Sequence, residues 1–271
     1  MKIRLLLAAL LIAMFAATTW AVASYAPIMG IDWVHVYRPA ALAMANGQSP
    51  YGVTDLPFVN PPWVLLPMLP IALLDPRIGV GVMFATNLFA FVYVMMRFRV
   101  HPLLVPVMIF ATMNNLFNGN IDGLVALGFL LPPQIGLFFM LAKPQMGIAV
   151  AIFWLFQAWR QGGVKQVIKV FAPVIIALVA SVLIYGFWMV TDITTIWWNA
   201  SIWPWGIPVG LVLIVIAIWK QDIKWVVGAS PFLAPYLTGH TWAFAILGAF
   251  VLLRSDQEVI YSKRELCEVA V

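Results

Sequence analysis

Long stretches without a single charged residue recur along this chain. Three of them, 5–23, 78–96 and 170–190, are close to the length of about 20 residues that an α-helix needs to cross the hydrocarbon core of a bilayer. Runs of this length and composition are typical of membrane helices. The sequence therefore predicts an all-α protein, a polytopic bundle of transmembrane helices.

The scarcity of charge extends over the whole chain. Only 9% of the 271 residues are charged and 64% are hydrophobic, whereas a soluble domain usually has about 25% charged residues. We therefore expect a single integral-membrane domain over 1–271. The net charge of +5 is spread over the connections between apolar segments, which indicates membrane orientation and not nucleic-acid binding. The histidines lack metal-site spacing and there is no glycine-rich phosphate loop, so we expect neither a metal nor a cofactor.

The apolar segments are unequal in length. Several are shorter than a straight span, and prolines interrupt others, which is tolerated where a segment packs inside the protein or lines a cavity. We expect about eight to ten membrane segments, some of them short or re-entrant, around a polar chamber. The segments expected after the first helix are 60–77, 78–96, 102–117, 121–142, 146–159, 170–190, 207–219, 225–237 and 242–253.

The N-terminus predicts the orientation of the chain. Lys2 and Arg4 precede a first apolar run that is longer than the usual apolar region of a signal peptide. We therefore expect a retained helix with its basic end in the cytoplasm. The stretch 27–60 would then be an extracytoplasmic loop with a surface helix near 34–45, in which Val34, Tyr37, Ala41 and Leu42 share one face.

Two other parts of the chain differ in how well the charge rule orients them. The tail 254–271, which carries Arg254, Lys263 and Arg264, is expected in the cytoplasm. The orientation of 61–142 stays open, because a complete span at 61–76 would place Arg97 and Arg99 outside the cell, and a re-entrant segment would reverse this.

An acidic residue, Asp32, follows the first helix where that helix leaves the bilayer. A carboxylate there can act as a general base toward a hydroxyl, because partial burial raises its pKa toward the working pH. His35 follows three residues later and would lie on the same helical face. The alternative is that Asp32 caps the next helix, and the spacing alone slightly favours this cap.

Further polar groups stand in apolar surroundings. Asp122, in NGNIDG, lies at the mouth of an apolar segment, where a cap and a turn are the favoured explanation. Lys143 has no acid near it in the sequence, so it either binds an anionic headgroup or extends to the interface. Tyr236 and His240 lie four residues apart. The tryptophans of 197–208 form an interfacial belt or stack on a sugar or an isoprenoid.

Five blocks follow one another in a distinctive order: DWVHVYRPAALAMANGQSPY (32–51), NPPWVLLPMLP (60–70), KPQMG (143–147), NASIWPWG (199–206) and SPFLAPY (230–236). In this order they resemble blocks of the polytopic GT-C glycosyltransferases. The most similar branch is glycosyltransferase family eighty-seven, the polyprenyl-phosphate-mannose-dependent type. Each block is weak alone, and their common order, over most of the chain, makes the resemblance moderately specific.

The resemblance implies a GT-C-like fold and an inverting transferase. Such an enzyme moves a sugar, mannose or another hexose, from a polyprenyl-phosphate donor to a lipid or glycan acceptor on the extracytoplasmic side. The acid of the family's first external loop corresponds to Asp32, which would be the catalytic base, and this shifts the preference from cap to catalysis. The leaving phosphate needs cations or hydrogen-bond donors. The expected substrate-binding residues are His35, Arg38, Tyr51, Asp122, Lys143, Gln145, Asn199, Tyr236 and His240.

Two other functions remain open from the sequence. A transporter or flippase of lipid-linked solutes would also use broken helices and polar residues within the membrane. A non-catalytic membrane subunit of a larger complex would suit the short chain, and an Asp32 without an adjoining cavity would favour it. For all three functions we expect a multi-pass protein in contact with membrane lipids, in a prokaryotic plasma membrane.

Overall fold

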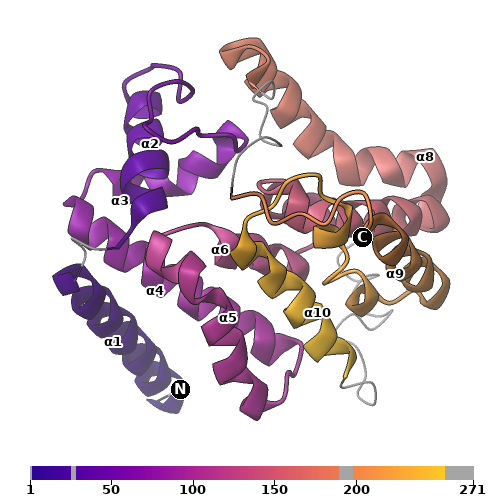
Figure 1. Cartoon of the computed structure of the whole chain (residues 1–271), viewed down its shortest axis with the longest axis horizontal. Coiled ribbons are helices and arrows are strands. Elements are labelled where there is room, and N and C mark those ends of the chain that lie inside the picture. The colour runs from indigo at the N-terminus through magenta and orange to yellow at the C-terminus, as the bar shows by residue number, and fades with distance from the viewer. Residues whose placement is uncertain (1, 26–28, 189–197, 254–271) are drawn as a thin grey trace.

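The computed structural model describes residues 2–25, 29–188 and 198–253, and this part of the chain is helical without a strand (Figure 1). Within it, three helices are long and apolar enough to cross a membrane: α1 (Lys2–Tyr25), α4 (Pro76–Arg97) and α8 (Pro144–Tyr185). The expected all-α class is confirmed for these residues, and the spans indicate a membrane protein. The tail 254–271 lies outside the described residues.

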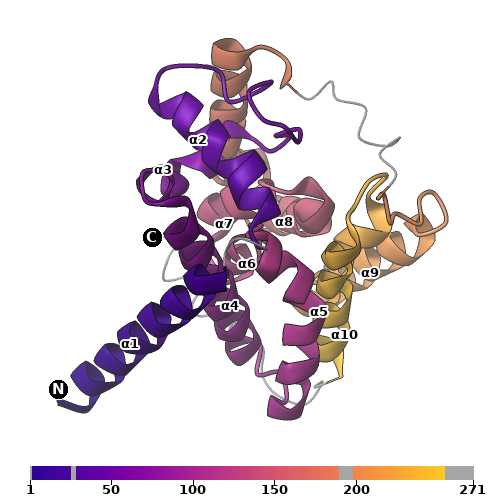
Figure 2. The same cartoon turned by 60° about the vertical axis from the view of Figure 1, so that its left-hand side comes forward.

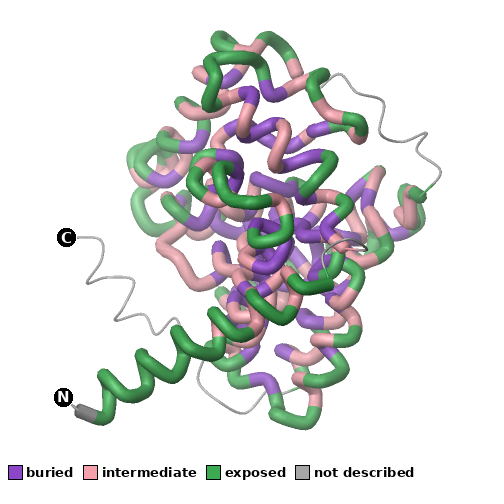
Figure 3. The backbone as a smooth tube through the Cα atoms, turned by 90° about the vertical axis from the view of Figure 1, so that its left-hand side faces the viewer, coloured by how far each residue is buried: buried purple, intermediate pink, exposed green. Residues whose placement is uncertain are grey.

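The helices α1 and α4 pack side by side in opposite directions. Their rings of Phe15 and Phe89 meet edge to face, with 5.7 Å between centroids. Closer to the other end, a Cβ on Gly81 would lie 2.3 Å from the carbonyl oxygen of Thr19, so only glycine permits this approach. Apart from this seam, α1 leans away from the bundle and is exposed along most of its length (Figure 3). An apolar helix with so little protein cover suits lipid as its surroundings.

The loop after α1 contains the expected surface helix, in a modified form. A π-helical turn, Trp33–Tyr37, leads directly into α2 (Arg38–Ala45). Tyr37 and Ala41 are buried as expected, whereas Val34 is exposed. The expectation that Val34 shares their face is therefore wrong, because a π-turn has more residues per turn than the α-helix from which that face was calculated.

The segment 60–77 does not form a membrane span. It consists of a 3₁₀ stretch, Pro62–Met68, followed by the single turn α3 (Leu69–Ala72), and both lie beside α2 (Figure 2). Repeated prolines prevent a regular helix here. Because α4 packs against α1 in the opposite direction, Arg97 lies at the end of this helix pair where α1 begins.

The middle of the chain is a series of short helices. A 3₁₀ turn, Pro102–Leu104, precedes α5 (Val105–Asn118), which ends at Gly119 in the left-handed conformation with φ 68°. The expected segment 121–142 is indeed interrupted: α6 (Asp122–Leu127) passes through a 3₁₀ turn, Gly128–Leu130, to α7 (Pro133–Met140). Pro132 and Pro133 cause this break, since a proline disfavours helix in the residue before it.

The C-terminal half contains α8, α9 (Ile207–Lys220) and α10 (Ala243–Leu252). The long α8 unites the expected segments 146–159 and 170–190, but it is broken at Gly162 and Gly163, whose φ/ψ angles are non-helical. The segment expected at 225–237 is not a helix. It contains only 3₁₀ turns, at Ile223–Trp225 and Ser230–Leu233, and a third, Gly239–Trp242, precedes α10.

Candidate functional site

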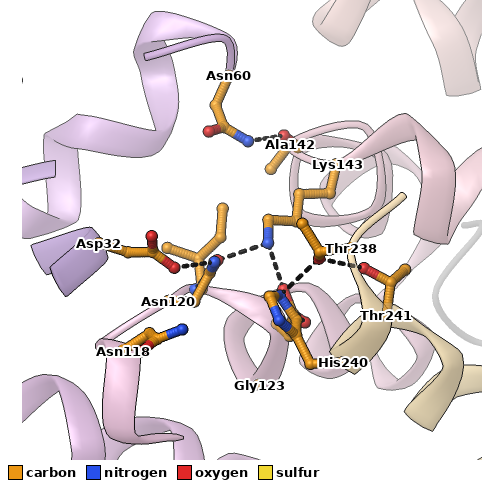
Figure 4. Close-up of polar contacts among 12 residues, drawn as sticks. Asp32, Asn60, Asn118, Asn120, Gly123, Ala142, Lys143, Thr238, His240 and Thr241 are labelled. Carbon is orange, nitrogen blue, oxygen red and sulfur yellow. Dashed lines mark hydrogen bonds and ion pairs between the residues drawn. The ribbon is translucent and has the colours of Figure 1, made fainter. Parts of the chain in front are cut away.

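A cavity of about 800 Å³ opens between the loop after α1, α5, the start of α8 and the turn before α10. This volume lies within the range of small-molecule sites, about 300–1,000 Å³. Its polar lining brings together residues that are distant in the sequence, and Figure 4 shows how several of them converge. The lining includes Asp32, Asn114, Asn118, Asn120, Lys143, Gln145, Trp198, Tyr236, Thr238 and His240.

Glycines allow two distant segments to meet at the wall of the cavity. Gly30, with φ 81°, donates from its N–H to the carbonyl oxygen of Phe117 over 2.6 Å. A Cβ on Gly119 would lie 2.8 Å from the Cβ of Trp33, so the turn after α5 passes directly over the start of the π-turn. This contact places the residue after Gly119 beside the residue before Trp33.

Asp32 presents one carboxylate oxygen to the cavity. Its Oδ2 accepts a hydrogen bond from Nδ2 of Asn120 at 2.5 Å. Its Oδ1 accepts none from the described residues, and Asp32 makes no side-chain cap to the turn that follows. The cap interpretation is therefore wrong. Burial raises the pKa of Asp32 above the ordinary value of 3.8, while Lys143 and the bond from Asn120 act in the opposite direction.

Lys143 and Asp122 form a buried ion pair, with 2.5 Å between Nζ and Oδ1. Only 5% of Lys143 and 1% of Asp122 is exposed, so the two charges are removed from solvent together. The expectation of a lysine without an acid partner is wrong, because Asp122 lies 21 residues away in sequence but at the same site. The cap explanation for Asp122 is also wrong, since Ile121 occupies the N-cap position of α6 and the Asp122 carboxylate bonds to Lys143. Lys143 Nζ also donates to Oδ1 of Asn120 at 2.5 Å.

His240 is held by hydrogen bonds in a defined tautomer. Its Nδ1 lies 3.1 Å from Oδ1 of Asn114, which can only accept, so Nδ1 carries the proton. Its Nε2 lies 2.9 Å from the Thr238 hydroxyl and 3.5 Å from Oδ2 of Asp122. In the neutral ring, Nε2 accepts a hydrogen bond from the Thr238 hydroxyl. If Nε2 were protonated, the ring would form an ion pair with Asp122, in addition to the pair between Asp122 and Lys143.

Aromatic residues form the opposite wall. Trp198 and Tyr236 both line the cavity, and Nε1 of Trp198 donates to the Tyr236 hydroxyl over 2.9 Å. Within the same aromatic loop, Trp205 is 85% exposed. The two explanations for the tryptophans thus apply to different residues, since Trp198 faces the cavity and Trp205 faces the surroundings. Asn199 braces this loop, because its Nδ2 donates to the carbonyl oxygen of Pro235.

Five expected binding residues lie outside the lining of the cavity: His35, Arg38, Tyr51, Asp122 and Asn199. His35 turns outward and pairs with Asp55 at 3.1 Å on the surface, because the π-turn removes it from the face of Asp32. Arg38 begins α2 and does not reach the cavity. Tyr51 lies behind the wall, where its hydroxyl donates to the carbonyl oxygen of Asn60.

The sequence analysis missed several polar residues of the site. They are four asparagines, Asn60, Asn114, Asn118 and Asn120, and one threonine, Thr238. Asn120 contacts both Asp32 and Lys143, and Asn60 donates to the carbonyl oxygen of Ala142 (Figure 4). Asn114 holds His240. A signal was present in MNNLFNGNIDG, since such a density of amides is unusual in an apolar chain. Amides have no charge to mark them in a composition profile, and their role depends on the partners they meet.

The described residues contain no group of three or more His, Cys, Asp or Glu side chains that could hold a metal ion. Lys143 is the cation of the cavity lining in the described chain, and Asp122 balances its charge. The site therefore offers one carboxylate with an available oxygen, amide and hydroxyl groups, and aromatic faces. No known protein family, curated protein or solved structure matches this chain.

Proposed function

We propose that this protein is an integral-membrane glycosyltransferase, which moves a hexose from a polyprenyl-phosphate donor to a lipid or glycan acceptor. The observation that carries the proposal is the Asp32 carboxylate, which has one oxygen bonded to Asn120 and the other available in a cavity of about 800 Å³. A general base needs this arrangement, with an available lone pair, partial burial and space for the substrate. The resemblance of five sequence blocks to GT-C enzymes supports the same reaction.

The proposed reaction is a single displacement. The acceptor oxygen bonds to the anomeric carbon as the bond from that carbon to the donor phosphate breaks. The hydroxyl proton moves to Oδ1 of Asp32, and the electron pair of the breaking bond leaves with the lipid phosphate. Lys143 Nζ has three N–H groups, of which two bond to Asn120 and Asp122. The third is available to the phosphate, and Trp198 and Tyr236 offer faces for the sugar ring.

The position of Asp32 favours a transferase over a non-catalytic subunit. A subunit that uses this loop only for assembly would not need a carboxylate at the wall of a polar cavity. Burial raises the pKa of Asp32, so the fold bears a cost for keeping this group ionised, as catalytic sites commonly do. For a transporter, we find no internal repeat in the sequence that would support one.

The test of the proposed function is a transfer assay with the purified protein. The protein would be reconstituted in liposomes with radiolabelled polyprenyl-phosphate mannose or polyprenyl-phosphate glucose, together with a lipid extract as the source of acceptors. We expect labelled product with at least one donor and the release of polyprenyl phosphate. A protein that remains folded and releases no sugar from any polyprenyl-phosphate hexose would contradict the proposal.

We further propose that the cavity opens on the extracytoplasmic side of a plasma membrane. Arg97 lies at the end of α4 next to the N-terminus of α1, and Arg160 donates to the carbonyl oxygen of Ile218 near the end of α9. Arg97 is the last residue of α4, and Arg160 lies just before the break of α8 at Gly162, well along the helix from Lys143. Since basic residues gather on the cytoplasmic side, the cavity belongs to the other side.

Cysteine labelling tests this orientation. In a background with Cys267 replaced by serine, we expect Ser49→Cys to react with an impermeant maleimide added to intact cells, because Ser49 is exposed in the loop beside the cavity. Gln161→Cys is the matched control, since Gln161 is exposed and follows Arg160, which this orientation assigns to the cytoplasmic side. It should react only after the membrane is opened. The reverse pattern would overturn the orientation.

A further inference from the structure

The orientation of the Asn120 side chain is fixed by chemistry. Its Oδ1 lies 2.5 Å from Nζ of Lys143 and 2.7 Å from the backbone N of Ile121. Both groups can only donate, so the atom that faces them must be the amide oxygen. The amide nitrogen then faces Oδ2 of Asp32, at 2.5 Å, and can only donate to it.

The backbone of Asn120 is held as firmly as its side chain. Its N–H donates to the carbonyl oxygen of Asn115 over 3.2 Å, and its own carbonyl oxygen accepts from Nδ2 of Asn87 over 2.6 Å. The Asn87 side chain also accepts from the N–H of Gly123, on the other side of the turn. Asn120 therefore has one position and one orientation, which suits a group that must hold another in place.

We propose that Asn120 is a positioning residue, which holds Oδ2 of Asp32 and links this carboxylate to the Lys143–Asp122 ion pair, so that Oδ1 is left to the acceptor hydroxyl. The inference rests on the proposed function, in which Asp32 is the base. The ammonium of Lys143 polarises the amide of Asn120 and strengthens its donation to Asp32. Through the amide of Asn120, the charge of Lys143 therefore stabilises the ionised carboxylate of Asp32, although Lys143 makes no hydrogen bond to Asp32.

Other charged and titratable groups face Asp32, but at longer range. The ammonium of Lys143 and the ring of His240 favour its ionised form, and the carboxylate of Asp122 opposes it. The hydroxyl of Tyr37 bonds to Oδ1 of Asn120 at 3.1 Å, and Tyr236 lies across the cavity. Among the described residues, Asn120 alone donates a hydrogen bond to the carboxylate of Asp32. Removal of this donor should therefore act on Asp32 first.

The test measures the protonation of Asp32 without the need for activity. Dicyclohexylcarbodiimide reacts with protonated carboxyl groups, so the yield of modified Asp32 against pH, measured by mass spectrometry, gives its titration midpoint. In Asn120→Ala we expect this midpoint to rise by about one to two pH units, the effect of losing one hydrogen bond to a charged group. Asn118→Ala is the matched control. Asn118 lines the same cavity but bonds to Asn114 and not to Asp32. The titration midpoint of Asp32 in Asn118→Ala should therefore equal that of the wild type.

A second variant covers the case in which Asn120→Ala does not fold. Asn120→Asp keeps the size of the side chain but sets two carboxylates against each other, so they must share a proton and the midpoint must rise. Equal midpoints in wild type and a folded Asn120 variant would overturn the inference. Because labelling does not depend on sugar transfer, an inactive wild type would refute the proposed function without affecting this result.

In an active preparation, the same variants have a kinetic signature. For Asn120→Ala we expect the acid limb of the kcat profile to move to higher pH together with the labelling midpoint. KM should change by less than about threefold, because Asn120 bonds directly to the base and reaches the donor phosphate only through Lys143. A loss of activity that is equal at every pH would indicate a structural defect and would overturn the positioning role.

Discussion

Asp32→Asn is expected to reduce kcat for sugar transfer by about 10²–10⁴-fold, the usual contribution of a general base. The substitution preserves the site, because an amide oxygen at this position still accepts from Nδ2 of Asn120. The NH₂ group then replaces Oδ1 at the cavity, and it has no basic lone pair. Transfer assays in proteoliposomes measure the loss. Asp55→Asn is the control, since Asp55 is an exposed acid of the same loop that pairs with His35.

The pH dependence gives this prediction a second readout. The base works when ionised, and burial raises the pKa of Asp32 above 3.8. Activity of the wild type should therefore fall as the pH decreases through this raised pKa, at a higher pH than for a solvent-exposed aspartate. The acid limb should be missing from the residual activity of Asp32→Asn. A variant that keeps both full activity and the acid limb would exclude Asp32 as the base.

Asp32→Asn should not destabilise the protein, unlike most substitutions of a partly buried polar group. Because the folded protein binds a proton at Asp32 more tightly than the unfolded chain does, stability decreases as the pH rises between the unfolded and the folded pKa. Above this window the ionised carboxylate is a cost to the fold. The asparagine variant is therefore expected to unfold in detergent at the same temperature as the wild type or at a higher one.

Lys143→Met is expected to be the most destabilising single change at the site. It leaves the carboxylate of Asp122, which is 1% exposed, without the cation that compensates it. Breaking a buried pair in this way costs about 3–5 kcal/mol, because an uncompensated charge stays in the interior. Thermal unfolding of the purified protein in detergent measures the effect, as a decrease in the unfolding temperature.

A double variant separates the charge from the shape of this pair. Lys143→Met together with Asp122→Asn removes both charges, so it should recover part of the stability that Lys143→Met loses. Lys224→Met is the control, since Lys224 pairs with Asp222 at 2.9 Å where both side chains are partly exposed. Water reaches this pair more readily than the Lys143 pair, so its loss is expected to cost less. Equal losses for the two lysines would show that burial of the Lys143 pair has no special weight.

The sequence by itself determined the class of the protein and the positions of many of its segments. Apolar runs of sufficient length predicted α1 and α4, and the prolines at 132 and 133 predicted the break between α6 and α7. It also identified the polar loop that follows α1 and its acid, Asp32. These features are local, because helix length and proline breaks depend on the composition of a short stretch of chain.

The tertiary structure decided which polar groups meet. Asp122 and Lys143 lie 21 residues apart, and the bond from Asn120 to Asp32 joins positions 88 residues apart. Their contacts depend on the close crossing at Gly119, where only a residue without a Cβ fits in the left-handed turn. One π-turn likewise directed His35 to Asp55 and away from the cavity. Such pairings depend on how distant segments pack, and composition and periodicity describe only short stretches of chain. The free energy of a buried charge depends on the partner that the packing brings to it.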